Sequence, residues 1–438
     1  MVISDYVDFP SYSHTLIIPC QVNKDCITLN DYCPWLIANH PMFQKAKIPY
    51  SVTWMQEIAE IPQNEWDALA MPLKTPFLEW EWLNNLEVSG SASARTGWQP
   101  CHLTVWQDNQ LIAAAPLYIK GHSYGEFVFD HQWADLSHRL GIPYYPKLLG
   151  MVPFTPAEGY RFLIAPEMDE DEITEMMIEE IDRFCLRNEI SGCNFLFVDP
   201  QWQGTMEKHG FNAWRHHSYI WQNHDFASFD DYLKMFNTNQ RRNIKRERKA
   251  VAKAGLEVKT FSGEDIPQEL FPLIHYFYNN TCNKFYWGSK YLTEQFFRQL
   301  YPKYSHRVLL VAAYTEGAKE SDPVGMSFCL RKGEQLYGRY WGCLEEYDCL
   351  HFEACYYKPI EWAIANKIKI FDPGAGGRHK KRRGFPATPN HSLHRFYNKR
   401  MGKILCSYID EINEMEQAEI EAINQDLPFR KGGGKLGK

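Results

Sequence analysis

The chain lacks the features that mark several classes of protein. Its twelve cysteines contain no pair separated by two residues and follow no regular spacing, which argues against a disulfide framework and indicates reduced thiols. No apolar run approaches the ~20 residues that cross a bilayer. The first residues lack the basic and apolar segments of a secretory signal. We therefore expect a cytoplasmic protein without a membrane span.

The chain also lacks an excess of positive charge. Its net charge of −7 at pH 7 disfavours DNA as a partner, because nucleic-acid-binding domains are usually basic. Hydrophobic residues make up 45% of the sequence, which is enough to form substantial cores. Since 438 residues exceed what one core usually accommodates, the length favours two domains.

The sequence does contain a repeated pattern. In each half, a hairpin, a strand and a helix precede a short apolar strand that ends in Asp-Pro. A helix that connects neighbouring strands of one sheet makes them parallel, so the pattern predicts an α/β (α+β) fold of two tandem units with mixed sheets. The first-half elements are His102–Trp106 with Leu111–Ile119, Tyr124–Asp130, Glu172–Asn188 and Asn194–Pro200. The second-half elements are His306–Tyr314 with Val324–Leu330, Leu336–Gly342, His351–Asn366 and Lys367–Pro373.

This pattern also predicts domain boundaries. The mixed, aperiodic residues before the first predicted strand form an N-terminal extension, and an acidic amphipathic pattern near the end predicts a helix followed by a disordered tail. The predicted units are an extension (1–49), a first half (50–222), a second half (223–406) and a C-terminal acidic helix with its tail (407–438).

The most informative stretch is Lys367–Phe385. Its strand stops at Asp372 and is followed by a glycine cluster that includes Gly374 and Gly376, then by a run of basic residues that includes Lys380 and Arg383. Glycine allows backbone N–H groups to approach a ligand closely, so the stretch predicts an anion or polar-ligand site. The alternative is a glycine turn followed by a solvated basic loop.

A second basic feature is the predicted helix over 239–254. Seven of the residues from Arg241 to Lys253 are Lys or Arg, against one Glu, and Arg242, Arg246, Lys249 and Lys253 recur along one face. Phosphate, pyrophosphate or an RNA backbone would suit this face, with Arg242 and Lys245 as phosphate contacts. The alternative is a merely solvated basic helix.

A long connection, His131–Pro166, supplies further candidates. Its aromatic and cationic residues suit a pocket for a polar ligand, whereas the alternative is a lid of packed aromatics. These candidates are Tyr144, Tyr145, Lys147 and Arg161. We expect no metal site, because His379, His391 and His394 have no carboxylate or thiol nearby to complete a ligand set.

Several segments together resemble a known family. They are 131–134, 141–148, 153–156, Arg241–Ile244, Lys253–Gly255, Phe371–Ala375, His379–Lys380, Arg383–Phe385 and Pro428–Lys431. Over about Tyr50 to Lys431 the chain resembles FemAB-like proteins of the GNAT acyltransferase superfamily, which are assigned to peptidoglycan biosynthesis or recognition. The resemblance implies tandem GNAT-like (acyl-CoA N-acyltransferase) domains, in which the acyl donor lies between two splayed parallel strands. Here those strands are Leu336–Gly342 and Lys369–Asp372.

The resemblance also implies an activity. The function is transfer of an acyl or aminoacyl group to a small-molecule or nucleotide-linked amine, as in cell-wall precursor modification, with no tightly bound cofactor. The donor is acyl-CoA or aminoacyl-tRNA, and tRNA is a possible partner. Enzymes that use acyl-CoA carry a glycine-rich loop after the first splayed strand, whereas Cys343–Asp348 is acidic and contains no glycine.

Transfer to an amine requires a proton acceptor and groups that polarise the acyl carbonyl. The candidate proton acceptors are Asp372, Glu353 and His379. The candidate substrate contacts are Arg242, Lys245, Lys147, Tyr144, Tyr145, Arg161, Arg339, Tyr340, Gly374, Gly376, Lys380 and Arg383. The alternative is a non-catalytic GNAT-like module that recognises a nucleotide-linked precursor or RNA.

Overall fold

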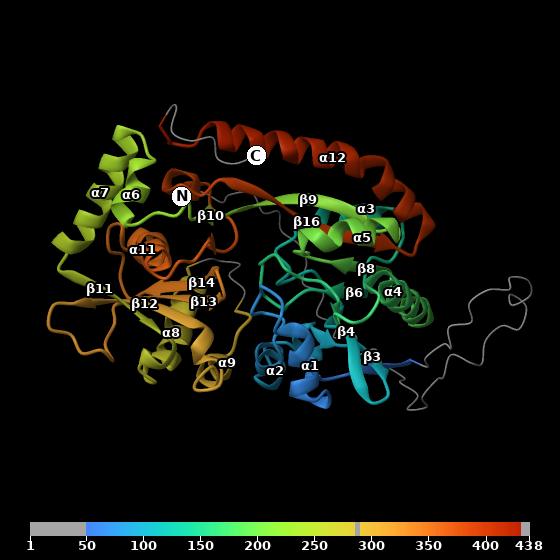
Figure 1. The fold of residues 1–438 in the computed structure, drawn as a ribbon. Coiled ribbons are helices and arrows are strands. Elements are labelled where there is room, and N and C mark those ends of the chain that lie inside the picture. The colour runs from blue at the N-terminus through green and yellow to red at the C-terminus, as the bar shows by residue number, and fades with distance from the viewer. Residues whose placement is uncertain (1–49, 285–289, 431–438) are drawn as a thin grey trace, which may run out of the picture.

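The computed structural model describes residues 50–284 and 290–430 (Figure 1). The predicted N-terminal extension (1–49) and the predicted disordered tail lie outside the described residues. The acidic helix predicted before that tail lies within them. No helix in the described ranges is both long and apolar enough to cross a membrane. The described residues form three sheets with helices packed around them, which confirms the predicted α/β class.

Two of the sheets belong mainly to the first half. The smaller, with strand order β1-β3-β4-β7, contains β1 (Ser51–Met55), β3 (His102–Gln107), β4 (Gln110–Ala115) and β7 (Leu163–Ile164). The larger, with order β2-β5-β6-β8-β16-β9, contains β2 (Gln99–Pro100), β5 (Leu117–Lys120), β6 (Lys147–Gly150), β8 (Gly192–Phe195), β16 (Ala387–Phe396) and β9 (Asn212–Tyr219). Asp108 and Asn109 both have positive φ in the turn between β3 and β4, as a tight hairpin requires.

The third sheet belongs mainly to the second half. Its order is β10-β15-β14-β13-β12-β11, and its strands are β10 (Trp221–Gln222), β15 (Ile370–Asp372), β14 (Gln335–Cys343), β13 (Gly325–Lys332), β12 (Val308–Thr315) and β11 (Leu256–Ser262). Strand β12 lies inside the sheet and is buried over Val308–Tyr314, which explains its nearly continuous apolar sequence.

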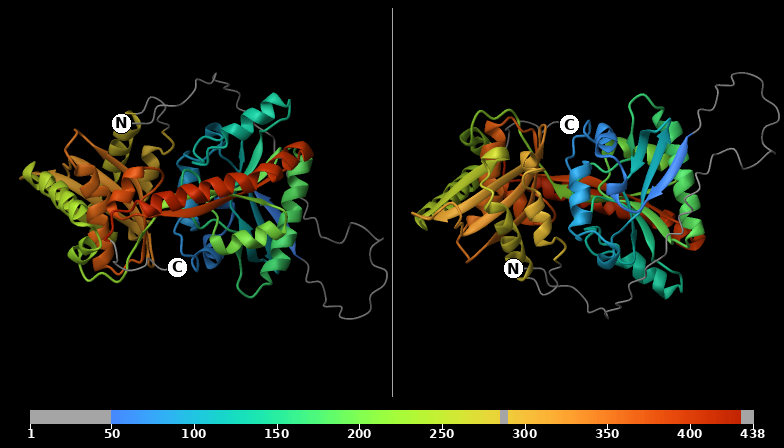
Figure 2. Two further views of the ribbon diagram at one scale, coloured as in Figure 1. Left: turned by 90° about the horizontal axis from the view of Figure 1, so that it is seen from above. Right: turned by 90° about the horizontal axis from the view of Figure 1, so that it is seen from below.

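Helices cover these sheets and connect the halves (Figures 1 and 2). The first half contains α1 (Gln63–Ala70), α2 (Trp80–Val88), α3 (His131–Arg139), α4 (Glu170–Arg187) and α5 (Pro200–Lys208). The second contains α6 (Phe229–Lys234), α7 (Thr238–Lys253), α8 (Leu270–Cys282), α9 (Glu294–Gln299), α10 (Leu350–Phe352), a π-helical turn (Glu353–Tyr357) and α11 (Lys358–Ala365). The long α12 (Lys399–Gln425) lies across both halves.

Both halves contain a crossover between parallel strands. In the first half α4 connects β6 to β8, and in the second the helical segment Leu350–Ala365 connects β14 to β15. The tandem arrangement predicted from the sequence is therefore confirmed. The predicted third strand of the first half, Tyr124–Asp130, is wrong, because this segment turns at Gly125 and Phe127, both with positive φ. Strand β6 takes that place, so His131–Pro166 is also not one long loop.

The chain crosses between the halves more than once. Strand β9 pairs with β16 in the first-half sheet, and β10, which follows it directly, pairs with β15 in the second-half sheet. Strand β16 then returns to lie between β8 and β9. The predicted boundaries at 222 and 406 stay predictions. Helix α12 begins earlier than predicted because the Asn398 side chain accepts hydrogen bonds from the N–H groups of its first turn.

Candidate functional site

The end of strand β15 is the centre of the candidate site. Strands β15 and β14 are parallel and paired from Ile370 to Asp372, opposite Gln335 to Tyr337, which confirms the predicted pair. Beyond this point β15 stops, whereas β14 continues to Cys343. The carboxyl end of a parallel strand is where open α/β sheets place their ligands.

Asp372 is held firmly at this strand end. Its side chain is buried, Oδ1 accepts a hydrogen bond from the Gly374 N–H (2.8 Å), and Oδ2 accepts one from Arg339 (3.3 Å). Gly374 has φ +88°, and a Cβ there would lie 2.9 Å from the Gly338 carbonyl oxygen. Glycine is therefore required at position 374 for two independent reasons. Gly376 also has positive φ but open space around it.

Arg339 brings a positive charge to the same place. Its side chain is 2% exposed, pairs with Asp372 and lies over the Phe77 ring, 5.0 Å from the ring centroid. Its Nε is buried and has no partner among the described residues. Tyr340, the next residue of β14, packs instead among Tyr278 and Phe297. The structure therefore separates two candidates that are adjacent in the sequence.

Lys380 reaches the same site from the 3-10 turn Arg378–Arg383. Its Nζ is buried and donates hydrogen bonds to the carbonyl oxygens of Gly374 (2.5 Å) and Ala375 (3.1 Å). Burial lowers the pKa of Lys380 to about 8, although the charge of Asp372 opposes this shift. We call Asp372, Arg339, Gly374 and Lys380 the strand-end site.

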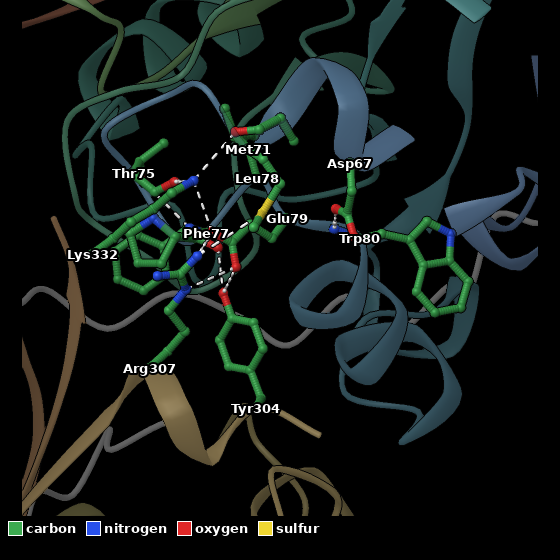
Figure 3. Close-up of polar contacts among 12 residues, drawn as sticks. Asp67, Met71, Thr75, Phe77, Leu78, Glu79, Trp80, Tyr304, Arg307 and Lys332 are labelled. Carbon is green, nitrogen blue, oxygen red and sulfur yellow. Dashed lines mark hydrogen bonds and ion pairs between the residues drawn. The ribbon is translucent and has the colours of Figure 1, made fainter. Parts of the chain in front are cut away.

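A segment of the first half forms one wall of this site. The Phe77 ring packs edge-on against the Tyr337 ring, with 5.0 Å between the ring centroids, and the Thr75 side chain of the same segment accepts a hydrogen bond from the Phe77 N–H (3.3 Å). Glu79 fixes this segment against the second half, because its carboxylate pairs with Arg307 (2.8 Å) and Lys332 (2.8 Å) (Figure 3). The strand-end site therefore lies at the interface between the two halves.

Two further carboxyl groups of the first half lie near Asp372. Half-buried Glu158 has a raised pKa of about 8, because burial and the charges of Asp199 and Asp372 all disfavour its ionised form. Asp199 ends the first-half Asp-Pro strand and caps α5 by accepting a hydrogen bond from the Gln201 N–H (2.8 Å). The sequence does not predict Glu158 as a site residue. The repeated Asp-Pro pattern was its only available signal, and that pattern does not contain it.

A basic groove lies on the other side of the Arg378–Arg383 turn. Its volume is about 490 Å³, and it is lined by Gln240, Asn243, Arg246, Glu247, Phe352, Arg378, His379, Lys381, Arg382 and Arg383. We call this set the basic groove. Arg383 is buried, pairs with Glu247 (3.0 Å) and lies over the Phe352 ring at 3.3 Å. Arg246 and Arg382 are exposed and form no ion pair with any described carboxylate.

Helix α7 forms one side of this groove. Its N-terminus is capped by Asn237, and it ends at Gly255, which has φ +70°. The predicted phosphate contacts Arg242 and Lys245 are exposed on this helix but do not line the groove. On this helix the groove is lined by Gln240, Asn243, Arg246 and Glu247, so Arg246 is the residue of the basic face that it includes.

The other two predicted proton acceptors have partners of their own. Glu353 is buried in an ion pair with Arg248 (3.0 Å); burial raises its pKa, although Arg248 opposes the shift. The His379 Nε2 lies 2.8 Å from the Tyr356 hydroxyl, and burial, with the charges of Arg383 and Lys380, lowers the pKa of His379 to about 4. His379 is therefore neutral near pH 7. No described contact connects Glu353 or His379 to Asp372.

The remaining predicted contacts lie in the first half. Lys147 is 2% exposed and pairs with Glu126 (2.7 Å) and Asp130 (2.6 Å). The Tyr144 hydroxyl donates to Asp130 (2.8 Å), and Tyr145 reaches the same residues through Ser123. We call Lys147, Glu126, Asp130, Tyr144 and Tyr145 the first-half charge cluster. Arg161 lies apart from this cluster in an ion pair with Glu170.

No group of three or more His, Cys, Asp or Glu within the described ranges could hold a metal ion. Histidines 216 and 394 both lie within hydrogen-bond distance of Ser392, at 2.8 and 2.7 Å, and the neighbouring Asn194 amide oxygen approaches His394 at 3.1 Å. Ser392, His394 and Asn194 are buried. Burial lowers the pKa of His394 to about 3, so His394 is neutral near pH 7. These four side chains form a polar network inside the first-half sheet.

Comparison with known proteins identifies the family. A FemAB-like family model, described as peptidoglycan biosynthesis/recognition, matches residues 57–431. The chain belongs to this FemAB-like family. The match confirms the resemblance drawn from the sequence. No curated protein matches this sequence.

Solved structures also resemble this FemAB-like protein. The crystal structure of FemX aligns with this chain with a TM-score of 0.49 and 11% sequence identity. The alignment covers 81% of this chain and 99% of FemX. The C-terminal domain of a putative lysylphosphatidylglycerol synthetase from Agrobacterium fabrum is 9% identical with a TM-score of 0.48, over 81% and 97%. A tandem GNAT protein from the clavulanic acid pathway is 8% identical with a TM-score of 0.39, over 79% and 98%. The family assignment rests on the sequence match alone.

Proposed function

We propose that this FemAB-like protein is an N-acyltransferase that moves an acyl or aminoacyl group onto the amine of a nucleotide-linked acceptor. The observation that carries the proposal is the strand-end site, where a buried carboxylate and a buried guanidinium meet at the end of a pair of parallel strands. Family membership supports an acceptor from peptidoglycan metabolism. Burial matters because charged groups act more strongly on a substrate when water is excluded.

The chemistry divides between these groups as follows. Arg339 stabilises the negative charge that develops on the acyl carbonyl oxygen, since its Nε lacks a described partner. Both Asp372 oxygens already accept hydrogen bonds within the site, which fixes the carboxylate in place. We therefore assign Asp372 the role of orienting the attacking amine and not that of accepting its proton. Lys380 holds the glycine segment through the carbonyl oxygens of Gly374 and Ala375.

The basic groove would bind the phosphates of the substrate. The Arg378–Arg383 turn belongs to both places, because Lys380 contacts the strand-end site while Arg382 and Arg383 line the groove. A molecule with phosphates in the groove could therefore present its reactive group near Asp372. Phosphate oxygens suit the exposed guanidinium groups of Arg246 and Arg382.

The direct test is a transfer assay with purified protein. We would combine labelled acetyl-CoA, another acyl-CoA or aminoacyl-tRNA with a UDP-linked peptidoglycan precursor and detect the amide product by mass spectrometry. The proposal expects product from at least one donor with the wild type, and transfer that is slower by ~100-fold or more with Asp372→Asn at equal folded concentration. Absence of product with every donor would contradict it.

The same reagents distinguish the donors. The segment after β14 carries Glu345, Glu346 and Asp348, which would repel the pyrophosphate of acyl-CoA. We therefore expect aminoacyl-tRNA to raise the unfolding midpoint of the protein and acetyl-CoA to leave it unchanged. A non-catalytic recognition module is the second candidate, which this acidic segment favours. Stabilisation by the precursor without transfer from any donor would support that candidate.

A further inference from the structure

We infer that Glu158, a residue of the first half, is a catalytic residue of the transfer and accepts the proton of the attacking ammonium group. The inference rests on the proposed function and adds a group from the opposite half to its site. Its basis is the place of the segment that carries Glu158. This segment lies against the end of the first-half strand and against the first-half residues that pack on Tyr337, the β14 partner of Asp372.

The location of Glu158 follows from the backbone around it. The next two residues, Gly159 and Tyr160, donate N–H groups to the Phe197 carbonyl oxygen at 2.9 and 3.0 Å, so the segment lies beside the end of the strand that leads to Asp199. On its other side, a Cβ at Gly159 would lie 3.2 Å from the Thr75 side chain. Phe77, two residues after Thr75, packs edge-on against Tyr337, which is the β14 partner of Asp372 in β15. Glu158 is therefore held where the two halves meet.

The charges around Glu158 come from several elements. Asp199 at the start of α5 and Asp372 at the end of β15 are negative, and Glu158 in turn acts on Tyr337 of β14. Arg339, also on β14, is paired with Asp372 and therefore offsets part of its charge. Within the described residues, no side chain donates a hydrogen bond to the Glu158 carboxyl group, whereas both Asp372 oxygens are occupied.

Each of these features suits a proton acceptor. Burial together with the charges of Asp199 and Asp372 raises the pKa of Glu158 to about 8, which is closer to neutral pH than that of an ordinary carboxyl group. An acceptor with an ordinary carboxyl pKa would take a proton from an ammonium group far less readily. The buried, unpartnered Arg339 Nε provides an independent sign that a polar ligand belongs between the two halves.

The transfer step then balances. Glu158 takes one proton from R–NH₃⁺, and the free amine attacks the acyl carbon to form the C–N bond. The bond from the acyl carbon to the leaving oxygen of an ester donor breaks with its electron pair on that oxygen. The second proton of the nitrogen passes to the leaving oxygen, which gives an amide and an alcohol, and Glu158 later releases its proton to solvent.

The decisive experiment compares Glu158→Gln with the wild type in single-turnover transfer from pH 6 to pH 10. The wild-type rate should rise with an inflection near pH 8, whereas Glu158→Gln should be at least ~100-fold slower and lack that inflection. Glu167→Gln is the matched control, because Glu167 is exposed in the same half. An unchanged rate and profile in Glu158→Gln would overturn the inference.

Asp199→Asn identifies the group that titrates. Removing the Asp199 charge should lower the Glu158 pKa, so the inflection of the rate should move to lower pH. If the inflection belonged to the amine of the substrate, Asp199→Asn would leave it in place. An inflection that does not move would therefore overturn the assignment to Glu158.

A stability measurement separates this inference from the proposed function. The pKa of Glu158 is raised to about 8 in the folded state but has its ordinary value in the unfolded state. The contribution of Glu158 to stability is therefore fully present below the ordinary pKa and is lost as pH rises to about 8. The wild type should therefore lose stability relative to Glu158→Gln between pH 5 and pH 9 in urea unfolding. A constant difference would overturn the inference even if transfer occurs. No transfer by the wild type would overturn the proposed function and the catalytic role together.

Discussion

Each half of this FemAB-like protein buries a lysine next to a pair of parallel strands, but the two lysines have different surroundings. Lys147 begins β6 and lies between Glu126 and Asp130. Burial alone would lower its pKa, but the two carboxylates raise it above the ordinary value. Lys380 follows β15 and contacts only carbonyl oxygens, so burial lowers its pKa to about 8. Two carboxylates therefore compensate the positive charge of Lys147, whereas no carboxylate pairs with Lys380 among the described residues.

This difference shows how a duplicated fold can divide its roles. The first-half charge cluster is closed over by Trp133 of α3 and by Met401 and Leu405 of α12, which pack against Tyr144. The strand-end site of the second half borders the basic groove instead, because the Arg378–Arg383 turn belongs to both. We therefore assign stability to the buried charges of the first half and chemistry to those of the second.

The largest expected effect is a difference in transfer rate between substitutions at the two Asp-Pro aspartates, Asp372 and Asp199. Asp372→Asn should reduce the transfer rate ~100-fold or more, because the amine loses its charged orienting partner. Asp199→Asn should cost only a few-fold at the optimal pH, since Asn retains the capping oxygen for α5. Single-turnover rates at several pH values measure both. Equal losses in the two variants would contradict the division of roles.

The next effect concerns the first-half charge cluster. Lys147→Met leaves the buried carboxylates of Glu126 and Asp130 without their cation, which should lower the unfolding free energy by ~3–5 kcal/mol. Urea unfolding followed by tryptophan fluorescence measures it, with the exposed Lys234→Met as control. If Lys147→Met were fully stable but inactive, the cluster would belong to the active site instead.

A somewhat smaller effect tests the interface that aligns the halves. Glu79→Gln leaves Arg307 and Lys332 without their shared carboxylate and should cost about 3 kcal/mol of stability. It should also reduce transfer, because Phe77 would no longer be fixed against Tyr337. The exposed pair Glu294–Arg298 offers the control: Glu294→Gln should change stability by no more than ~0.5 kcal/mol. Unaltered transfer in Glu79→Gln would show that this wall does not shape the site.

The smallest effect concerns the basic groove. Arg246→Gln and Arg382→Gln should each weaken binding of the UDP-linked precursor by about three- to tenfold, and the loss should shrink at high salt because both side chains are exposed. Isothermal titration calorimetry at two salt concentrations measures this. Lys253→Gln, at the far end of α7, serves as control. Affinity that is unchanged in both groove variants would place the phosphates elsewhere.

Much of the fold was predictable because its signals are local. The hairpin turn at Asp108 and Asn109, the apolar run of β12 and the Asp-Pro strand ends are all visible in short windows. Strand β6 has only four residues and gives a weak signal, whereas Tyr124–Asp130 contains the apolar run Phe127–Phe129 and therefore predicts a strand that the structure does not form. The return of β16 to the first-half sheet depends on long-range pairing, which no short window contains.

The candidate site was predictable only where it follows one strand. Asp372, Gly374 and Lys380 are close in sequence, and the structure brings them together with Arg339. The sequence also predicts Lys147 as a substrate contact and Glu353 as a proton acceptor, but each is buried against a charged partner. Glu158 could not be found, since its pKa depends on two aspartates that the fold alone brings near it.

The central claim is that substrate binds at the strand end of the second half and not at the charge cluster of the first. Hydrogen–deuterium exchange with and without a saturating UDP-linked peptidoglycan precursor tests it most directly. We expect protection in peptides that cover 240–247 and 372–384, with 144–150 unaffected. Protection confined to 144–150, with the second-half peptides unchanged, would contradict the account.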